Sequence, residues 1–174
     1  HINNRTDKPD NIVEQEYLIN RDCAEIEKEL PAFLDSVFSY MKSTLLPMSR
    51  REYLRDIRFF MKYLTEETRL TAADSPSEIT AREFSKLKGN DINRFLDYCR
   101  NYSVEKDGVL QVYTDSNKTR ARKKSALSSM FKTLYRDGLM PEDITGMFNP
   151  IRVQSPLERE IKAMQDDEVT IMLD

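Results

Sequence analysis

The side chains best suited to chemistry in this sequence are clustered Lys and Arg residues. Residues 117–136 contain seven of them and no acid, although the whole chain has a net charge of −3. Residues 48–64 contain five basic and two acidic residues. Lys and Arg form charge-assisted hydrogen bonds with phosphate groups, and nucleic-acid binding depends on where positive charge gathers as well as on the net charge. The two clusters therefore predict a nucleic-acid-binding surface.

The larger cluster lies at the start of a predicted helix over residues 116–136. The apolar face of this helix begins only at Leu127. Upstream, Arg120 and Lys123 occupy the same face, and no helix breaker separates them from the cap. We therefore expect the first turns to extend beyond the core, where the amides and dipole of a helix N-terminus also attract anions. The DNA-binding residues expected here are Lys118, Arg120, Arg122, Lys123 and Lys124.

The second cluster lies in a predicted helix over residues 49–67. Four of its cations recur at steps of 4, 3 and 4 residues, so they share one face, roughly 130° from the apolar face. Ser49 and Glu52 form a capping-box pattern, so the helix is predicted to begin at Ser49, and Ser49→Ala to cost about 0.5–2 kcal/mol. The DNA-binding residues expected here are Ser49, Arg50, Arg51, Arg55 and Arg58. The alternative for both clusters is a charged face that contacts only solvent.

The other reactive residues argue against catalysis by this chain. Its sole histidine is His1, where an imidazole base or metal ligand would lie in a loose terminus. Cys23 and Cys99 are 76 positions apart on apolar stripes, which favours reduced core thiols in a cytoplasmic protein. The acidic residues 166–168 are typical of a helix start, and no apolar run approaches the length of a membrane span. We expect no catalytic residue, metal, cofactor or small-molecule substrate.

Hydrophobic periodicity predicts an architecture of helices that positions these clusters. Asp22 is the expected cap of the second helix, Pro31 either kinks that helix or begins another, and Pro47 closes it. A short extended segment is predicted over residues 109–113. The helices are expected over residues 11–19, 22–46, 49–67, 91–102 and 116–136.

A short helix is expected between the helices over residues 49–67 and 91–102. Thr80 and Glu83 form a second capping-box pattern, which predicts a helix that runs to Lys88. Gly89 is expected to end this helix, and Asn90 to cap the next one.

The C-terminal part of the chain contains the clearest stop signals. Asp115 or Ser116 is the expected cap of the last long helix, and Gly138 follows it as a left-handed C-cap. Prolines mark an extended linker over residues 149–160, after which a helix is expected near Asp166. The chain starts with His1 and stops within an apolar-periodic segment, so we expect it to be a piece of a longer protein.

The order of these segments resembles the N-terminal part of tyrosine recombinases of the Xer and phage-type integrase family. Each matching motif is short, and their order and spacing make the resemblance specific. It covers residues 30–174. The matching stretches are residues 49–60, 91–96 and 119–134, followed by Asn149-Pro150 and residues 161–164.

The resemblance implies an all-α core-binding domain: a small orthogonal bundle of four to five helices, related to the SAM-like fold, with an extended C-terminal linker. In this family the domain forms half of a clamp around double-stranded DNA, and the recombinase assembles as a homo-oligomer, a tetramer, on DNA. The tyrosine nucleophile lies in a separate catalytic domain. The implied division is an N-terminal helical extension (1–29), the core-binding domain (30–148), a linker (149–160) and the start of a catalytic domain (161–174).

The resemblance also assigns DNA contacts to the starts of the two basic helices. The implied function is therefore DNA binding for integration and recombination of a mobile element. Two other functions stay open at this point: a non-catalytic helical DNA-binding regulator, and a helical module that binds an acidic protein partner.

Overall fold

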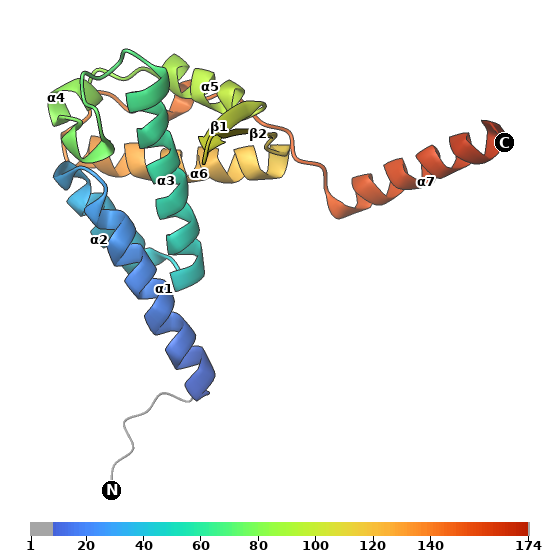
Figure 1. The fold of residues 1–174 in the computed structure, drawn as a ribbon, viewed down its shortest axis with the longest axis horizontal. Coiled ribbons are helices and arrows are strands. Elements are labelled where there is room, and N and C mark those ends of the chain that lie inside the picture. The colour runs from blue at the N-terminus through green and yellow to red at the C-terminus, as the bar shows by residue number, and fades with distance from the viewer. Residues whose placement is uncertain (1–8, 174) are drawn as a thin grey trace, which may run out of the picture.

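The structure, a computed structural model, describes the backbone of residues 9–173 and the side chains of residues 9–165. It is mostly helical, and its described part contains one small two-stranded sheet (Figure 1). The α-helices are α1 (Asp10–Lys28), α2 (Asp35–Thr44), α3 (Pro47–Glu67), α4 (Ala81–Phe84), α5 (Gly89–Tyr98), α6 (Asn117–Arg136) and α7 (Pro156–Leu173). Short 3₁₀-helices span Ala32–Leu34, Pro76–Glu78 and Ile144–Met147.

The sheet is a hairpin of β1 (Tyr102–Lys106) and β2 (Val109–Tyr113), paired antiparallel. The expected extended segment at 109–113 is thus confirmed, but β1 was missed, and a purely all-α fold is wrong. The two-residue turn explains the pairing. Asp107 and Gly108 have φ angles of 54° and 77°, the left-handed values that a type I′ turn requires and that Asp-Gly readily adopts.

The hydrophobic core forms where α3 crosses α6 (Figure 1). The Phe60 ring centroid of α3 lies 4.9 Å from that of Phe95 in α5 and 6.3 Å from that of Phe131 in α6. The apolar faces predicted for the two long helices are confirmed as buried, except at Tyr135, which the periodicity places on the same face of α6 and which is exposed. Their core residues are Leu54, Ile57, Phe60, Met61 and Leu64 in α3, and Leu127, Met130, Phe131 and Leu134 in α6.

The helix α1 packs along α3 and contributes to this core through Cys23 and Ile26. The segment assigned to an N-terminal extension therefore shares one core with residues 30–148. Both cysteines are buried free thiols, as the apolar stripes predicted. Burial raises the pKa of Cys99 to about 12, so this thiol stays protonated and unreactive at neutral pH.

Two expected helix starts are wrong because proline and long-range ion pairs override the local capping patterns. The helix α3 begins at Pro47, whose fixed φ suits the first helical position, and the Arg50 N–H donates to the Leu46 carbonyl at 2.9 Å. Pro47 therefore opens a helix instead of closing one, and Ser49 lies exposed within the first turn. Similarly, α1 runs unbroken through Asp22, which binds Arg51 in place of a cap.

Each of the helices α4 and α5 begins where a carboxylate in its first turn, from Glu83 or Asp91, accepts the N–H of the N-cap residue. The capping box of Thr80 and Glu83 is confirmed, although α4 ends at Phe84. The helix α5 begins at Gly89, so this glycine does not end the preceding helix. A Cβ at Gly89 would lie 2.4 Å from the Cβ of Met147, so a side chain has no room at this helix start.

The ends of α6 form as predicted. The Ser116 hydroxyl accepts the N–H of Thr119 at 3.1 Å, and Gly138 has a φ of 82°. The Leu139 N–H then donates to the Leu134 carbonyl at 3.0 Å, as in a Schellman motif.

The last helix starts ten residues before the expected position near Asp166. It begins at Pro156, where the Glu158 N–H donates to the Ser155 hydroxyl at 3.2 Å and the Ser155 N–H donates to the Glu158 carboxylate at 3.3 Å. The side chains of residues 166–168 lie outside the described ones. Within residues 9–173, no helix combines the length and apolar character needed to span a bilayer.

Capping contacts predict that the same substitution has a large effect at Ser116 and a small one at Ser49. Ser116→Ala removes the acceptor of the Thr119 N–H and is expected to lower the free energy of unfolding by about 0.5–2 kcal/mol. Ser49→Ala removes no capping bond and is expected to change it by less than about 0.5 kcal/mol. Urea unfolding followed by circular dichroism measures both; a larger loss for Ser49→Ala would contradict the observed start of α3.

The carboxylate of Glu83 predicts a pH dependence of stability. Its pKa is lowered to about 2 because it accepts the N–H groups of Ala72 (2.7 Å) and Thr80 (3.1 Å). An acid whose pKa is lowered by folding stabilises the fold above its unfolded pKa, and this stabilisation is lost as the pH falls from about 5 to 2. Glu83→Gln should therefore show a smaller drop in unfolding free energy over that range than the parent protein.

Candidate nucleic-acid interface

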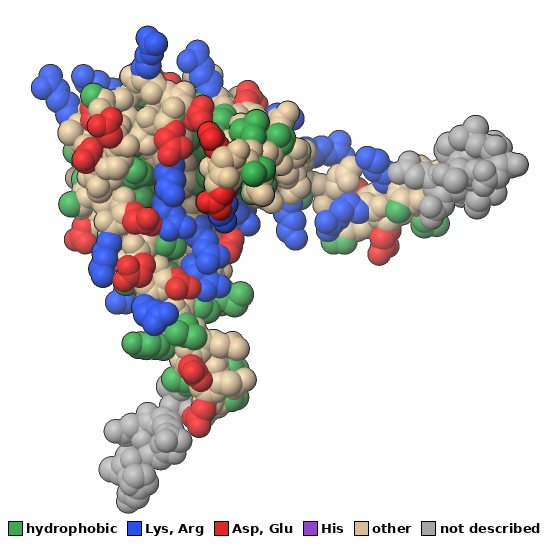
Figure 2. Space-filling view, viewed as in Figure 1, with side chains coloured by type: hydrophobic (Ala, Val, Ile, Leu, Met, Phe, Trp, Pro, Cys, Tyr) green, Lys and Arg blue, Asp and Glu red, His purple; other side chains and the backbone are tan. Residues whose placement is uncertain are grey.

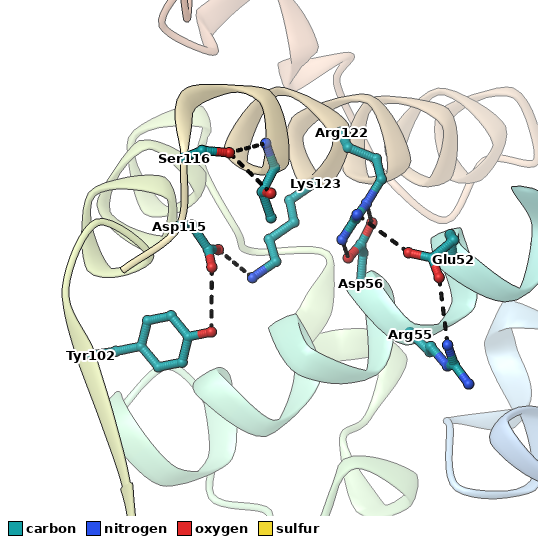
Figure 3. A network of polar contacts seen from close by, with 9 residues as sticks. Glu52, Arg55, Asp56, Tyr102, Asp115, Ser116, Arg122 and Lys123 are labelled. Carbon is teal, nitrogen blue, oxygen red and sulfur yellow. Dashed lines mark hydrogen bonds and ion pairs between the residues drawn. The ribbon is translucent and has the colours of Figure 1, made fainter. Parts of the chain in front are cut away.

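The basic half of α6 is held against α3 by a buried carboxylate. Arg122 donates from Nε and Nη2 to the two carboxylate oxygens of Asp56, each at 2.9 Å, and its Nη1 lies 3.3 Å from a Glu52 oxygen (Figure 3). Asp56 is only 3% exposed. Burial raises the pKa of Asp56, and the bonds and charge of Arg122 oppose that rise. Arg122 therefore compensates the charge of a buried carboxylate.

Lys123 points inward beside it. Its ammonium group donates to the Asp115 carboxylate and lies 4.1 Å from the centroid of the Phe59 ring and 5.6 Å from that of Tyr102. Asp115 also accepts a hydrogen bond from the Tyr102 hydroxyl at 3.4 Å (Figure 3). An ammonium between a carboxylate and two aromatic faces is fully engaged within the fold.

Of the three other predicted cations in α6, one is buried, one is partly engaged and one is exposed. Arg120 is 4% exposed and donates from Nε to the Leu96 carbonyl at 2.8 Å. Lys124 is half-buried and donates to the Asn149 carbonyl at 2.7 Å. Lys118 is exposed. The expectation that the first turns of α6 extend beyond the core is therefore wrong.

Two of the four cations in the basic stripe of α3 are paired with acids of α1 and its C-cap. Arg51 binds Asp22 at 2.9 Å and Arg58 binds Glu29 at 2.7 Å, and Lys and Arg side chains are mixed with Asp and Glu over this part of the surface (Figure 2). Arg50 is buried. Of the five residues predicted in α3, Ser49 and Arg55 are exposed, and Arg55 lies 3.4 Å from Glu52.

A different face of α6 lines an open groove. The groove has a volume of about 770 Å³ and is also lined by Tyr40 of α2 and by Asp143 and Ile151 after α6. Arg136 lies at its end, with its guanidinium carbon 4.9 Å from the centroid of the Tyr40 ring. We call it the α6 groove. Its hydrogen-bonding residues from α6 include Lys124, Ser125, Ser128, Ser129, Lys132 and Arg136.

A second pocket of about 490 Å³ lies at the N-terminus of α6. It is lined by Lys118, Arg152 and Arg159 among others, and contains no acidic lining residue. Hydrogen bonds from Asn117 to the Arg152 carbonyl and from Lys124 to the Asn149 carbonyl hold the chain after α6 against this helix. The two pockets therefore lie on either side of residues 149–152, along one helix.

Sequence reasoning missed most of the α6 groove. The serines, Lys132 and Arg136 recur at three- and four-residue steps with no acid among them, so a signal was present in the sequence. A search for charge alone passes over hydroxyl groups, although these donate readily to phosphate oxygens. Within the described residues, no group of three or more His, Cys, Asp or Glu is placed to hold a metal ion.

Comparisons with family models, with curated proteins and with solved structures found no match for this chain.

The Arg122–Asp56 contact predicts a pH-dependent loss of stability. Arg122→Ala leaves the buried carboxylate without its two bonds, so the free energy of unfolding should fall by about 1–3 kcal/mol at pH 8. Because folding raises the pKa of Asp56, the carboxyl becomes neutral more readily in the folded state, and the loss should shrink as the pH falls towards 4.

Urea unfolding at the two pH values measures this difference. Arg55→Ala is the matched control, since it removes an exposed contact to Glu52 and should cost less than about 1 kcal/mol. An equal loss for Arg122→Ala at pH 4 and pH 8 would contradict a buried, charged Asp56.

Proposed function

We propose that this chain binds double-stranded DNA through the outer face of α6, as the core-binding domain of a site-specific tyrosine recombinase. The observation that carries the proposal is the α6 groove, where ammonium, guanidinium and hydroxyl donors share one open surface. Phosphate oxygens accept hydrogen bonds and carry negative charge, so they match both properties of this surface. The order of motifs that resembles the integrase family supports the recombinase assignment.

The dimensions of the surface suit a duplex. A helix of 20 residues is about 30 Å long, which corresponds to roughly nine base pairs of B-DNA. Cations from α6 and from the chain after it line this surface, from the pocket at the N-terminus of α6 to the groove. They are Lys118, Lys124, Lys132, Arg136, Arg152 and Arg159.

The structure changes which residues the proposal uses. Arg120, Arg122 and Lys123 hold the fold together, and Arg51 and Arg58 are paired with α1. In this proposal the chain itself cleaves no DNA, and no residue of it is assigned a catalytic role. Assembly of the whole recombinase as a tetramer on DNA and a cytoplasmic location belong to the same proposal.

The salt dependence of binding tests the surface. Lys118→Gln/Lys132→Gln removes two exposed cations, one from each pocket. Each lost phosphate contact flattens the slope of log K against log salt by about 0.9, so the slope should flatten by about 1 to 2 and affinity for all duplexes should fall. Fluorescence anisotropy with a labelled duplex at several low salt concentrations measures both quantities.

Two controls sharpen the test. Lys28→Gln/Lys62→Gln removes two exposed lysines that line neither pocket, and should leave the slope unchanged. Lys123→Gln should lower stability without flattening the slope, because its ammonium is engaged by Asp115. Unchanged binding by the folded Lys118→Gln/Lys132→Gln variant would reject the proposal and favour an acidic protein partner for this face.

A further inference from the structure

The hairpin exposes apolar side chains that no other element within residues 9–165 covers. Apolar side chains gather over β1 and β2 in the space-filling view (Figure 2). Leu110 and Val112 of β2 are 65% and 66% exposed, which is unusual for large apolar residues in a strand. Their neighbours Val109 and Tyr113 are also exposed. All five residues of β2 therefore face solvent, and none is charged.

The base of the hairpin is fixed to the domain. The Tyr102 ring stacks between those of Tyr98 and Tyr113, with centroids 5.5 Å apart on each side, and lies 5.1 Å from Phe59 of α3. The Asp115 N–H donates to the Cys99 carbonyl at 3.1 Å, which closes the loop that carries the hairpin. The exposed strands are thus held in place.

The two edges of this sheet differ. Charged Glu105 and Lys106 lie on β1, and charges on an edge strand oppose pairing with another chain. On the β2 side, within the described residues, no backbone hydrogen bond joins the strand to any element other than β1. An uncharged and exposed edge that carries two β-branched residues, Val109 and Val112, is a surface on which another strand can pair.

The register fixes which groups of β2 are free. A two-residue type I′ turn is flanked by a hydrogen-bonded pair, here Lys106 and Val109. Hydrogen-bonded pairs alternate along the strands, so Val109, Gln111 and Tyr113 bond to β1. The N–H and C=O groups of Leu110 and Val112 therefore point away from β1.

We propose that β2 is a self-association edge, at which two copies of this chain pair β2 against β2 in an antiparallel, two-fold symmetric sheet of four strands. The register that places Gln111 on the symmetry axis sets Leu110 opposite Val112 of the second copy. In this register both outward N–H groups and both outward C=O groups of each strand are bonded. The pairs of Leu110 and Val112 also cover each other's exposed side chains.

A second copy of this chain meets the requirements of a two-fold contact at this edge. A two-fold contact must be self-complementary, and an uncharged strand meets itself without like-charge repulsion. In this register the outward N–H and C=O groups of Leu110 bond to those of Val112 in the second copy, and the reverse. This inference is independent of the proposed DNA binding, because β2 lies outside both α6 pockets.

Site-specific cross-linking tests the register. Across the proposed axis the two Gln111 residues form a non-hydrogen-bonded pair, with Cα atoms about 4.5 Å apart, within the range of a disulfide. Gln111→Cys should therefore form a disulfide dimer under mild oxidation with diamide, seen on a non-reducing gel at twice the 20.4 kDa of the chain. The native Cys23 and Cys99 are fully buried, so the parent should stay monomeric on this gel.

Val109→Cys is the matched control. It lies on the same strand and the same face, but in the proposed register it faces Tyr113 of the second copy, about 13 Å from the other Val109. It should form at least about tenfold less disulfide dimer than Gln111→Cys. Equal cross-linking of the two variants, or none with Gln111→Cys, would overturn the proposed pairing.

Sedimentation equilibrium tests association without a cross-link. The parent should show a mass that rises with concentration towards twice the monomer, and Val112→Pro, which removes an outward donor, should stay monomeric. Val112→Thr keeps that donor and a β-branched side chain and should still associate. A parent that is monomeric at millimolar concentration would overturn the proposal, and the edge would then be open to a strand from a different protein.

Discussion

The crossing of α3 and α6 depends on one buried carboxylate. Asp56 projects from α3 into the interface and cannot stay charged there unless two donors reach it. Arg122 supplies both, and thereby fixes the rotation of α6 about its axis as well as its position. That rotation turns Arg120 and Lys123 inward to Leu96 and Asp115. It also turns the face with the serines, Lys132 and Arg136 outward.

The same constraint extends to the hairpin. Lys123 lies between Asp115 and the rings of Phe59 and Tyr102, so its ammonium joins α6, α3 and the first strand. The tyrosine stack built on Tyr102 then fixes the base of the β1–β2 hairpin to the bundle. One buried polar network thus sets the direction of the α6 groove and of the exposed β2 edge. The two surfaces are separate in space and in chemistry: one cationic and hydrogen-bonding, the other uncharged and apolar.

Charge count alone misassigned the basic residues because it ignores distant acids. The twenty residues of α6 contain no acid. The sequence of this segment therefore does not indicate that Asp56, Asp115 and Glu52 form ion pairs with its cations. These acids lie outside α6, between 8 and 70 positions from the cations that they contact. Likewise the stripe of α3 was expected to face solvent, yet α1 brings Asp22 and Glu29 to it. Several cations were thus buried or paired by tertiary contacts that local sequence does not encode.

The amino-acid sequence by itself determined the long helical segments, both ends of α6 and the start of α4. Periodic apolar residues placed the inner faces of α3 and α6, and local caps such as Ser116, Gly138 and the Thr80–Glu83 pair act through neighbours in the chain. Such signals involve residues a few positions apart and can be recognised in the sequence without knowledge of the tertiary structure. Only the tertiary structure decided which cations remain exposed, where β1 pairs, and that α1 belongs to the core. Each of these depends on groups far apart in sequence, whose meeting is set by the packing of α1 and α6 on α3 and by the burial of Asp56.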